Sequence, residues 1–349
     1  MAFSRCPAAV LRDAETGPGR TAPGWQSRIM MSNRERRNGM AMLMSDETIQ
    51  LAKEWRIKSA IVYRDGELLE DWHDGGSDSL GPLYSITKSV LSALIGIALD
   101  RGEIGSIDQP IGDYLDVSEL DEQLRRSITI KHLLTMTPGF EWPDFDKPYK
   151  EMRASADPVA YTLAKPVIHE PGHAYTYNSG GSHLLSAILT AATGKSAVHY
   201  AKERLFQPLG FEAARWSEKN GISEGGTGLS LYGHDLAKIG MMYVQGGRWN
   251  GAEIVSPSWI EQSTALHHRG LLHYEPPIYG GYGYHWWISP EPFNGCADCY
   301  FAFGHGGQHL MNIPSLGLTI VIRKKITKRN DAKWARELIF QHLVPMALK

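Results

Sequence analysis

The stretch that best indicates the fold runs from residue 85 to residue 102 and reads SITKSVLSALIGIALDRG. Its apolar residues recur at the spacing of a single helix face, with Val90, Leu94 and Ile97 on one stripe. Gly102 follows as a stop signal, because glycine readily adopts the left-handed conformation that ends many helices. The pattern therefore predicts a strongly apolar helix over residues 85–101.

Extended patterns stand on both sides of a mostly helical middle. Residues 58–63 and 68–72 flank Asp65-Gly66, which is a hairpin signal. Further strands are expected over 300–303, 311–313 and 318–323, and helices over 46–55, 130–136, 158–164, 182–193, 198–206, 233–245, 257–266 and 331–343. We therefore predict an α+β fold in which an antiparallel sheet is flanked by helices and interrupted by a mostly helical domain. The sheet part is expected to comprise residues 45–84 and 225–349, and the helical part residues 85–224.

Composition narrows the class of protein. The chain has 349 residues, and 36 Lys and Arg against 38 Asp and Glu give a net charge of −2. Without a basic excess, nucleic acid and anionic membrane surfaces are disfavoured as partners. No run approaches the ~18 apolar residues of a membrane span. Three cysteines are too few for a disulfide framework, so we expect a reducing, cytoplasmic location.

The first 44 residues differ from the rest of the chain. They contain 6 of the 12 methionines and seven arginines but no lysine. We expect a poorly ordered extension, with an Arg-rich organelle transit peptide as the alternative.

One familiar motif can be set aside. The sequence TGKS at 193–196 looks like the end of a phosphate-binding loop, but the first glycine of that motif is replaced by Leu189. Gly194 is better explained as a helix cap.

No metal or cofactor site is expected. The histidines of the 267–273 segment occur without a carboxylate arrangement; they are His267, His268 and His273. Cys296 and Cys299 lack a second cysteine pair that would complete a zinc site. We expect them to lie in a plain loop or to form an incidental disulfide.

The candidate chemistry begins with Ser85 and Lys88, the one SxxK pair in the chain. A serine at the start of a helix lies near free backbone N–H groups, and a lysine three residues later shares its face. A serine hydroxyl needs a base within hydrogen-bond reach, and a partly buried lysine can serve. The alternative is a helix-capping serine followed by a surface lysine.

Two later motifs favour catalysis. Residues 171–181 read PGHAYTYNSGG, and residues 303–308 read FGHGGQ on an expected strand. With SxxK, in this order, the chain resembles the serine β-lactamase and penicillin-binding-protein superfamily. It is most similar to the class C-like branch with family VIII carboxylesterases and 6-aminohexanoate-dimer hydrolases. The resemblance covers most of residues 57–345.

The resemblance implies a role for each matching residue. Ser85 would be the acylated nucleophile and Lys88 its activating partner. Tyr177 would be a phenolate-like base whose pKa is lowered by the Lys88 ammonium. Tyr175 is the alternative if the register differs by two residues. The backbone N–H groups of Ser85 and Gln308 would form the oxyanion hole.

The chain departs from the superfamily pattern at two substrate-binding positions. Ser179 stands where Asn is usual, and His305-Gly306-Gly307 replaces Lys-Thr-Gly. Ser179, His305 and Gly307 are therefore the expected substrate-binding residues. A histidine is mostly neutral at pH 7, so strong β-lactam turnover is not expected.

Together these features predict a serine hydrolase that forms a Ser85 acyl-enzyme with a small carboxylic ester or linear amide, without a cofactor. A β-lactamase or a peptidase specific for D-amino acids is the alternative within this chemistry. A non-catalytic binding homologue is the alternative outside it, because two of the three motifs are altered.

Overall fold

The fold is described by a computed structural model that covers residues 43–349 except 119–122, 124–126, 144–146, 275 and 328–331. The expected N-terminal extension therefore lies outside the described residues apart from its last two positions. Met44 is buried there, and its backbone N–H donates to Glu70 Oε2 at 2.7 Å.

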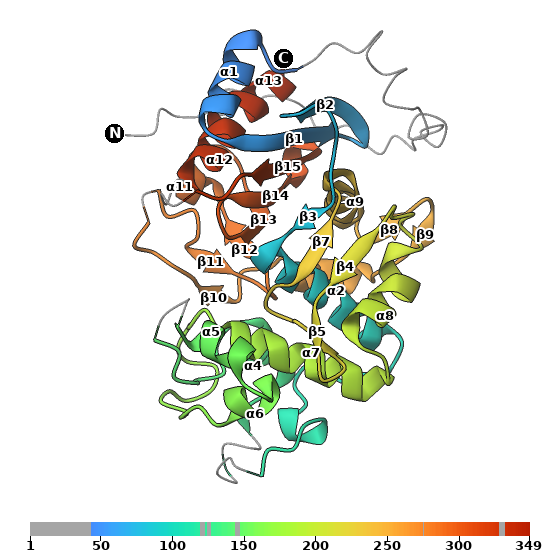
Figure 1. Cartoon of the computed structure of the whole chain (residues 1–349), viewed down its shortest axis with the longest axis vertical. Coiled ribbons are helices and arrows are strands. Elements are labelled where there is room, and N and C mark those ends of the chain that lie inside the picture. The colour runs from blue at the N-terminus through green and yellow to red at the C-terminus, as the bar shows by residue number, and fades with distance from the viewer. Residues whose placement is uncertain (1–42, 119–122, 124–126, 144–146, 275, 328–331) are drawn as a thin grey trace.

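An antiparallel sheet of eight strands forms the upper part of the molecule in Figure 1. Its order is β10 (His268–Arg269), β11 (Gly281–Tyr282), β12 (Trp287–Ser289), β13 (Cys299–Gly304), β14 (Gln308–Ile313), β15 (Leu318–Lys324), β1 (Ile57–Arg64) and β2 (Glu67–His73). β1 pairs with β15 from Ile57↔Lys324 to Arg64↔Leu318. Segments from both ends of the chain thus complete one sheet.

Each face of this sheet is covered by helices. One face packs against α1 (Asp46–Glu54), α12 (Lys333–Glu337), the π-helical turn η8 (Leu338–Leu343) and α13 (Val344–Ala347). The other face packs against α2 (Thr87–Asp100) and α9 (Gly233–Val244). Side chains alternate between the two faces along a strand, so Ile61 faces α2 and α9 while Val62 faces the terminal helices.

The helical part lies below the sheet in Figure 1. It contains α4 (Ile130–Leu134), α5 (Lys147–Ala154), α6 (Pro158–Leu163), α7 (Ser179–Thr193), α8 (Ala197–Ala201) and the π-helical turn η6 (Lys202–Phe206). α7 is central, because it contacts α2, α4 and α6.

Short elements complete the fold and join its two parts. A small sheet has the order β3 (Gly81–Pro82), β7 (Leu229–Leu231) and β4 (Ala214–Trp216). The others are η4 (Tyr84–Ile86), η5 (Ile111–Asp113), β5 (Glu218–Lys219), β6 (Ile222–Ser223), β8 (Arg248–Trp249), β9 (Ala252–Glu253), α10 (Pro257–Ser263), α11 (Glu291–Asn294) and η7 (Pro314–Leu316).

The expected α+β architecture is confirmed in its main elements. The helix predicted over residues 85–101 is η4 followed by α2, and Gly102 has φ +68°. Asp65 and Gly66 both have positive φ, as a two-residue hairpin turn requires. Gly194 caps α7 in the left-handed conformation, as expected.

Two details differ from the sequence prediction. The segment 137–155, for which no helix or strand was predicted, contains α5, whose sequence is polar and buries only Pro148 and Met152. Such a helix has too few apolar positions to show a period. His305 lies in the turn between β13 and β14 rather than on a strand, because Gly306 and Gly307 take positive φ.

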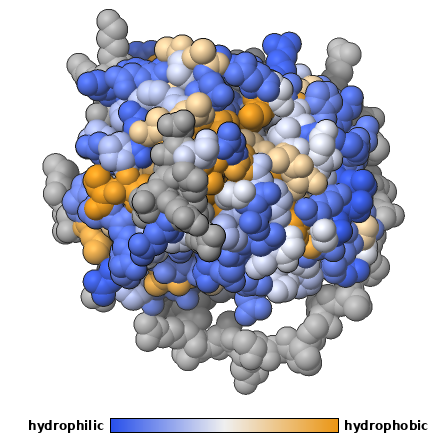
Figure 2. Space-filling model, turned by 90° about the horizontal axis from the view of Figure 1, so that it is seen from below, coloured by the Kyte–Doolittle hydropathy of each residue, from blue (hydrophilic) through white to orange (hydrophobic). Residues whose placement is uncertain are grey.

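Most of the large apolar side chains are buried. They form two large buried clusters, one on each face of the main sheet. Figure 2 shows the molecule from below, where the surface is mainly hydrophilic with smaller apolar areas between. Within the described residues, no helix combines the length and apolar character that a membrane crossing requires.

Candidate active site

Ser85 lies in a tight turn at the entrance to α2. The turn is η4, and Tyr84 within it has φ +51°, which is uncommon for a residue with a side chain. The hairpin of β13 and β14 lies against this turn: a Cβ on Gly304 would lie 2.2 Å from the Leu83 carbonyl oxygen. Glycine at 304 therefore permits the hairpin to approach the half-buried Ser85.

Lys88 lies one helical turn after Ser85 and is almost completely buried, with 1% exposure. Its Nζ donates to Ser85 Oγ at 3.1 Å, to Ser179 Oγ at 3.1 Å and to the Gly226 carbonyl at 2.7 Å. Burial lowers the pKa of Lys88 to about 7, although the negative charge of Glu224 acts to raise it. An amine with this pKa is partly unprotonated at neutral pH and can accept a proton from Ser85.

Tyr177 is the second group that reaches Ser85. Its hydroxyl is hydrogen-bonded to the Ser85 side chain, and Lys88 Nζ lies 4.9 Å from the centre of its ring. The ring stacks on Trp287 with centroids 5.7 Å apart. Burial raises the pKa of Tyr177 well above its usual value. The expectation of a lowered tyrosine pKa is therefore wrong, because desolvation outweighs any help from Lys88.

Tyr175, the alternative tyrosine, is placed elsewhere. It packs against Tyr282 at 5.3 Å and His268 at 6.0 Å between ring centroids. Its buried hydroxyl has no hydrogen-bond partner among the described residues. Tyr177 is thus the tyrosine of the 171–181 motif that contacts Ser85.

The Ser179 side chain is buried against Lys88 and does not line an open cleft. It is the first residue of α7, is 8% exposed and accepts the hydrogen bond from Lys88. The preceding Asn178 caps the helix, because its Oδ1 accepts from the Gly181 N–H at 3.0 Å. Ser179 was expected to bind substrate, but its contact is with the Lys88 amine.

The turn at 304–308 places the third motif beside η4. The exposed His305 ring makes an edge contact with Tyr84, with centroids 5.8 Å apart. The side of Gly307 on which a side chain would lie is turned toward β15 and away from Ser85, because a Cβ there would be 2.9 Å from the Lys324 side chain. The Gln308 carboxamide is buried and bonds both the N–H and the carbonyl of Lys324 at 3.1 and 2.9 Å. That side chain joins the hairpin to β15, so only the Gln308 backbone is available for an oxyanion.

Three further residues surround Lys88 and were not singled out from the sequence. Gly226 supplies the carbonyl, and a Cβ on it would lie 2.8 Å from Ser179 Cβ. Glu224 is bound by Arg153 at 2.5 Å and by Tyr149 at 3.0 Å. The glycine run 225–228 was the available signal, since consecutive glycines often mark a close backbone approach.

His285 is the third of these residues. It is fully buried with φ +61°, and burial together with Lys88 lowers its pKa to about 3. Its Nε2 lies 3.1 Å from Ser182 Oγ, and its carbonyl accepts from Ser89 Oγ at 2.6 Å. A neutral His285 therefore links α2 to α7 behind the lysine.

An aromatic wall adjoins the Ser85 site on the sheet side. Trp287 contacts Tyr177, and Tyr282 and Tyr279 pack against Trp287 at 4.8 and 5.1 Å between ring centroids. These rings are almost completely buried, so they hold the Tyr177 ring in place from the core side.

Comparison with known proteins agrees with this geometry. Residues 58–342 match the family model described as Beta-lactamase. A 6-aminohexanoate-dimer hydrolase of Paenarthrobacter ureafaciens is 25% identical over 253 residues, which cover 66% of this chain and 63% of that protein. The match therefore spans less than two thirds of that relative's length.

Solved structures show the same fold at low identity. A putative β-lactamase from Bacteroides dorei has a TM-score of 0.70 at 18% identity, covering 87% of this chain and 98% of that one. A putative 6-aminohexanoate-dimer hydrolase from Bacillus anthracis has a TM-score of 0.68 at 20% identity, covering 86% and 81%. The hydrolase EstCE1, titled as having promiscuous acyltransferase activity, has a TM-score of 0.66 at 15% identity, covering 86% and 96%. The predicted fold of the superfamily is thus confirmed.

Proposed function

The chain belongs to the beta-lactamase family, and from this premise we propose that it is a serine hydrolase acting on small carboxylic esters or linear amides. The observation that carries the proposal is the buried Lys88, whose amine contacts the Ser85 hydroxyl at 3.1 Å and has a pKa of about 7. A lysine on a solvated surface would keep a pKa near 10.5 and be a poor base at neutral pH.

The first half of the reaction forms an acyl-enzyme. Neutral Lys88 takes the proton of Ser85, and Ser85 Oγ attacks the substrate carbonyl carbon. The resulting oxyanion is held by the Ser85 N–H and by a backbone N–H of the 304–308 turn, for which the sequence predicts Gln308. Tyr177 keeps its proton at neutral pH because its pKa is raised. It donates that proton to the departing alcohol or amine, and the Lys88 ammonium then returns one to Tyr177.

The second half releases the acid. Water gives a proton to Lys88 and attacks the acyl carbon, and the ester bond to Ser85 breaks as Oγ recovers a proton. Ser179 and the Gly226 carbonyl hold the Lys88 amine in place through both halves.

A β-lactam or D-amino acid substrate is the second candidate within this chemistry. The description of the matching family model, Beta-lactamase, supports a β-lactam substrate. Against that candidate, the exposed His305 replaces the lysine of the superfamily motif, so the long ammonium side chain that would meet a substrate carboxylate is missing.

The decisive experiment combines covalent labelling with a substrate panel. A fluorophosphonate probe should label the wild type, and Ser85→Ala should lose both labelling and turnover of short p-nitrophenyl esters. Ser85 forms no side-chain cap, so its loss leaves the fold intact. Ser258→Ala, at an exposed serine, is the matched control and should behave as wild type. Retained labelling in Ser85→Ala would overturn the nucleophile, and no labelling of the wild type would favour the non-catalytic homologue.

A further inference from the structure

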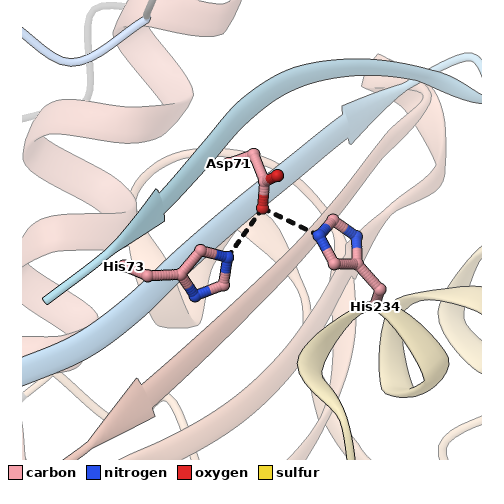
Figure 3. Close-up of side chains that lie close together, drawn as sticks. All are labelled: Asp71, His73 and His234. Atoms are coloured by element: carbon pink, nitrogen blue, oxygen red, sulfur yellow. Dashed lines mark hydrogen bonds and ion pairs between the residues drawn. The ribbon is translucent and has the colours of Figure 1, made fainter. Parts of the chain in front are cut away.

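A histidine and carboxylate cluster lies at the β2 edge of the main sheet, whereas the candidate active site lies beside the interior strands β13 and β14. Asp71 and His73 are two residues apart on β2, so their side chains share one face of the strand. His234 reaches them from the first turn of α9 (Figure 3). Asp71 Oδ1 lies 2.7 Å from His73 Nε2 and 2.8 Å from His234 Nε2.

The cluster is remote from Ser85. β2 is an edge strand, and β15 and β1 separate it from β14, which packs against η4. Three strand spacings amount to roughly 14 Å. The cluster therefore does not belong to the acyl-transfer site, and an inference about it stands independently of the proposed function.

We propose that Asp71, His73 and His234 form a binding site for one divalent transition-metal ion of the zinc type. The three ligand atoms all lie within 4.8 Å of one another. Two imidazole nitrogens and one carboxylate oxygen form a donor set that suits zinc, with water in the remaining position.

Burial at the cluster is intermediate. The side chains of His73, Asp71 and His234 are 7%, 22% and 25% exposed. A hydrated ion can therefore reach the cluster, while most of the surrounding solvent is excluded.

Tyr63 supplies the hydrogen-bond partner that a zinc-binding histidine usually has on its second ring nitrogen. The Nδ1 atom of His234 lies 3.1 Å from the Tyr63 hydroxyl, which comes from the neighbouring strand β1. Metal-binding histidines commonly donate their second ring N–H to such a partner, which orients the ring. This contact is an independent sign that His234 is held with Nε2 directed at Asp71.

Binding requires a change of tautomer that the cluster can accommodate. In the metal-free state both Nε2 atoms donate a proton to the Asp71 carboxylate. A metal ion needs the Nε2 lone pairs, so each ring proton must move to Nδ1 or leave. For His234 the Tyr63 hydroxyl serves both states, because it can donate to a bare Nδ1 and accept from Nδ1–H.

Nearby charges set the expected affinity. Asp78 accepts the His234 backbone N–H at 3.0 Å and adds a negative charge beside the cluster. Lys58 and Arg323 line the same depression as His73 and oppose cation binding. We therefore expect moderate affinity for zinc near neutral pH.

The site would cross-link the sheet edge to α9. β2 is bonded to the rest of the sheet on one side only. A metal joining Asp71 and His73 to His234 would add a second attachment and stabilise the folded state by mass action.

The test is calorimetric titration of the chelator-treated full chain with zinc chloride. The wild type should bind one equivalent, and Asp71→Asn and His234→Gln should each weaken binding by at least tenfold. Tyr63→Phe should weaken it by about tenfold, because it removes only the partner of a ligand. His199→Gln, at an exposed histidine outside the cluster, is the control and should bind as wild type.

Cobalt absorption and thermal unfolding make the test decisive. Cobalt bound by nitrogen and oxygen should give visible bands without a thiolate charge-transfer band, and a Cys296→Ser, Cys299→Ser double variant should bind as wild type. The thermal midpoint of each metal-free variant establishes that it is folded. Absence of stoichiometric zinc binding, binding that survives in folded His234→Gln, or binding lost with the cysteines would overturn the site.

Discussion

In the proposed mechanism, the environment of Lys88 sets the pH range of the reaction. Its lowered pKa of about 7 means that the base form is present above this pH and is lost below it. We predict that kcat/KM for a short ester rises with pH to a plateau with a midpoint near 7. Glu224→Gln removes the charge that raises the Lys88 pKa, so the midpoint should move to lower pH.

Glu203→Gln is the control for this shift, because Glu203 pairs with Lys195 on the surface. Its profile should match the wild type. An unchanged midpoint in Glu224→Gln, or activity that falls as pH rises through 7, would contradict Lys88 as the base.

We expect His305 to influence the choice between ester and β-lactam substrates. We predict that kcat/KM for a chromogenic cephalosporin is at least about tenfold below that for a C2 to C4 p-nitrophenyl ester, because a charge-assisted contact typically contributes about 1.5–3 kcal/mol. His305→Lys should narrow the gap, since the exposed turn has room for a longer side chain. A wild-type preference for the cephalosporin would refute this account of specificity.

The start of α7 is the element that positions the base. Asn178 caps this helix and is fully buried, and the next residue holds Lys88. Asn178→Ala should cost about 1 kcal/mol of folding free energy and should also displace Ser179. We predict that kcat falls at least tenfold while KM changes little, as measured by steady-state kinetics.

Asp157→Ala is the control for Asn178→Ala, because it also removes the N-cap side chain of a helix. Asp157 caps α6 through the N–H groups of Val159 and Ala160 and lies on the surface. Its loss should cost a similar free energy of unfolding and leave kcat unchanged. Equal kinetic effects in the two variants would mean that the cap acts only through overall stability.

The stability of the whole molecule depends on the buried clusters on both faces of the main sheet, but α2 belongs to only one of these clusters. Leu343, fully buried in η8, belongs to the cluster on the terminal-helix face. Leu343→Ala should destabilise the fold by about 2–5 kcal/mol. We predict a thermal midpoint lowered by several degrees with kcat/KM unchanged below the transition, whereas the half-buried Leu348→Ala should have a smaller effect. Lost activity in folded Leu343→Ala would show that packing at η8 affects Tyr177, which packs against the same cluster.

Much of the architecture was predictable because it is local. The period of residues 85–101, the Asp65-Gly66 turn and the Gly194 cap each depend on a few neighbouring residues, and all three are confirmed. α5 was missed because it buries too few apolar side chains to leave a pattern. The segment around His305 was predicted to be a strand and not a turn. The two glycines beside His305 would also fit a strand that lies close to another backbone segment, so they did not indicate a turn by themselves.

The sequence by itself determined which groups are available for chemistry: a serine and a lysine on one helical turn, two tyrosines, and a glycine-rich third motif. Tertiary structure alone decided how these groups behave. It brought Tyr177 rather than Tyr175 to Ser85, turned Ser179 toward Lys88, and added Gly226, Glu224 and His285 around the amine. The physical reason is that a pKa follows from desolvation and from charges contributed by distant segments, and neither can be read from residues adjacent in the chain.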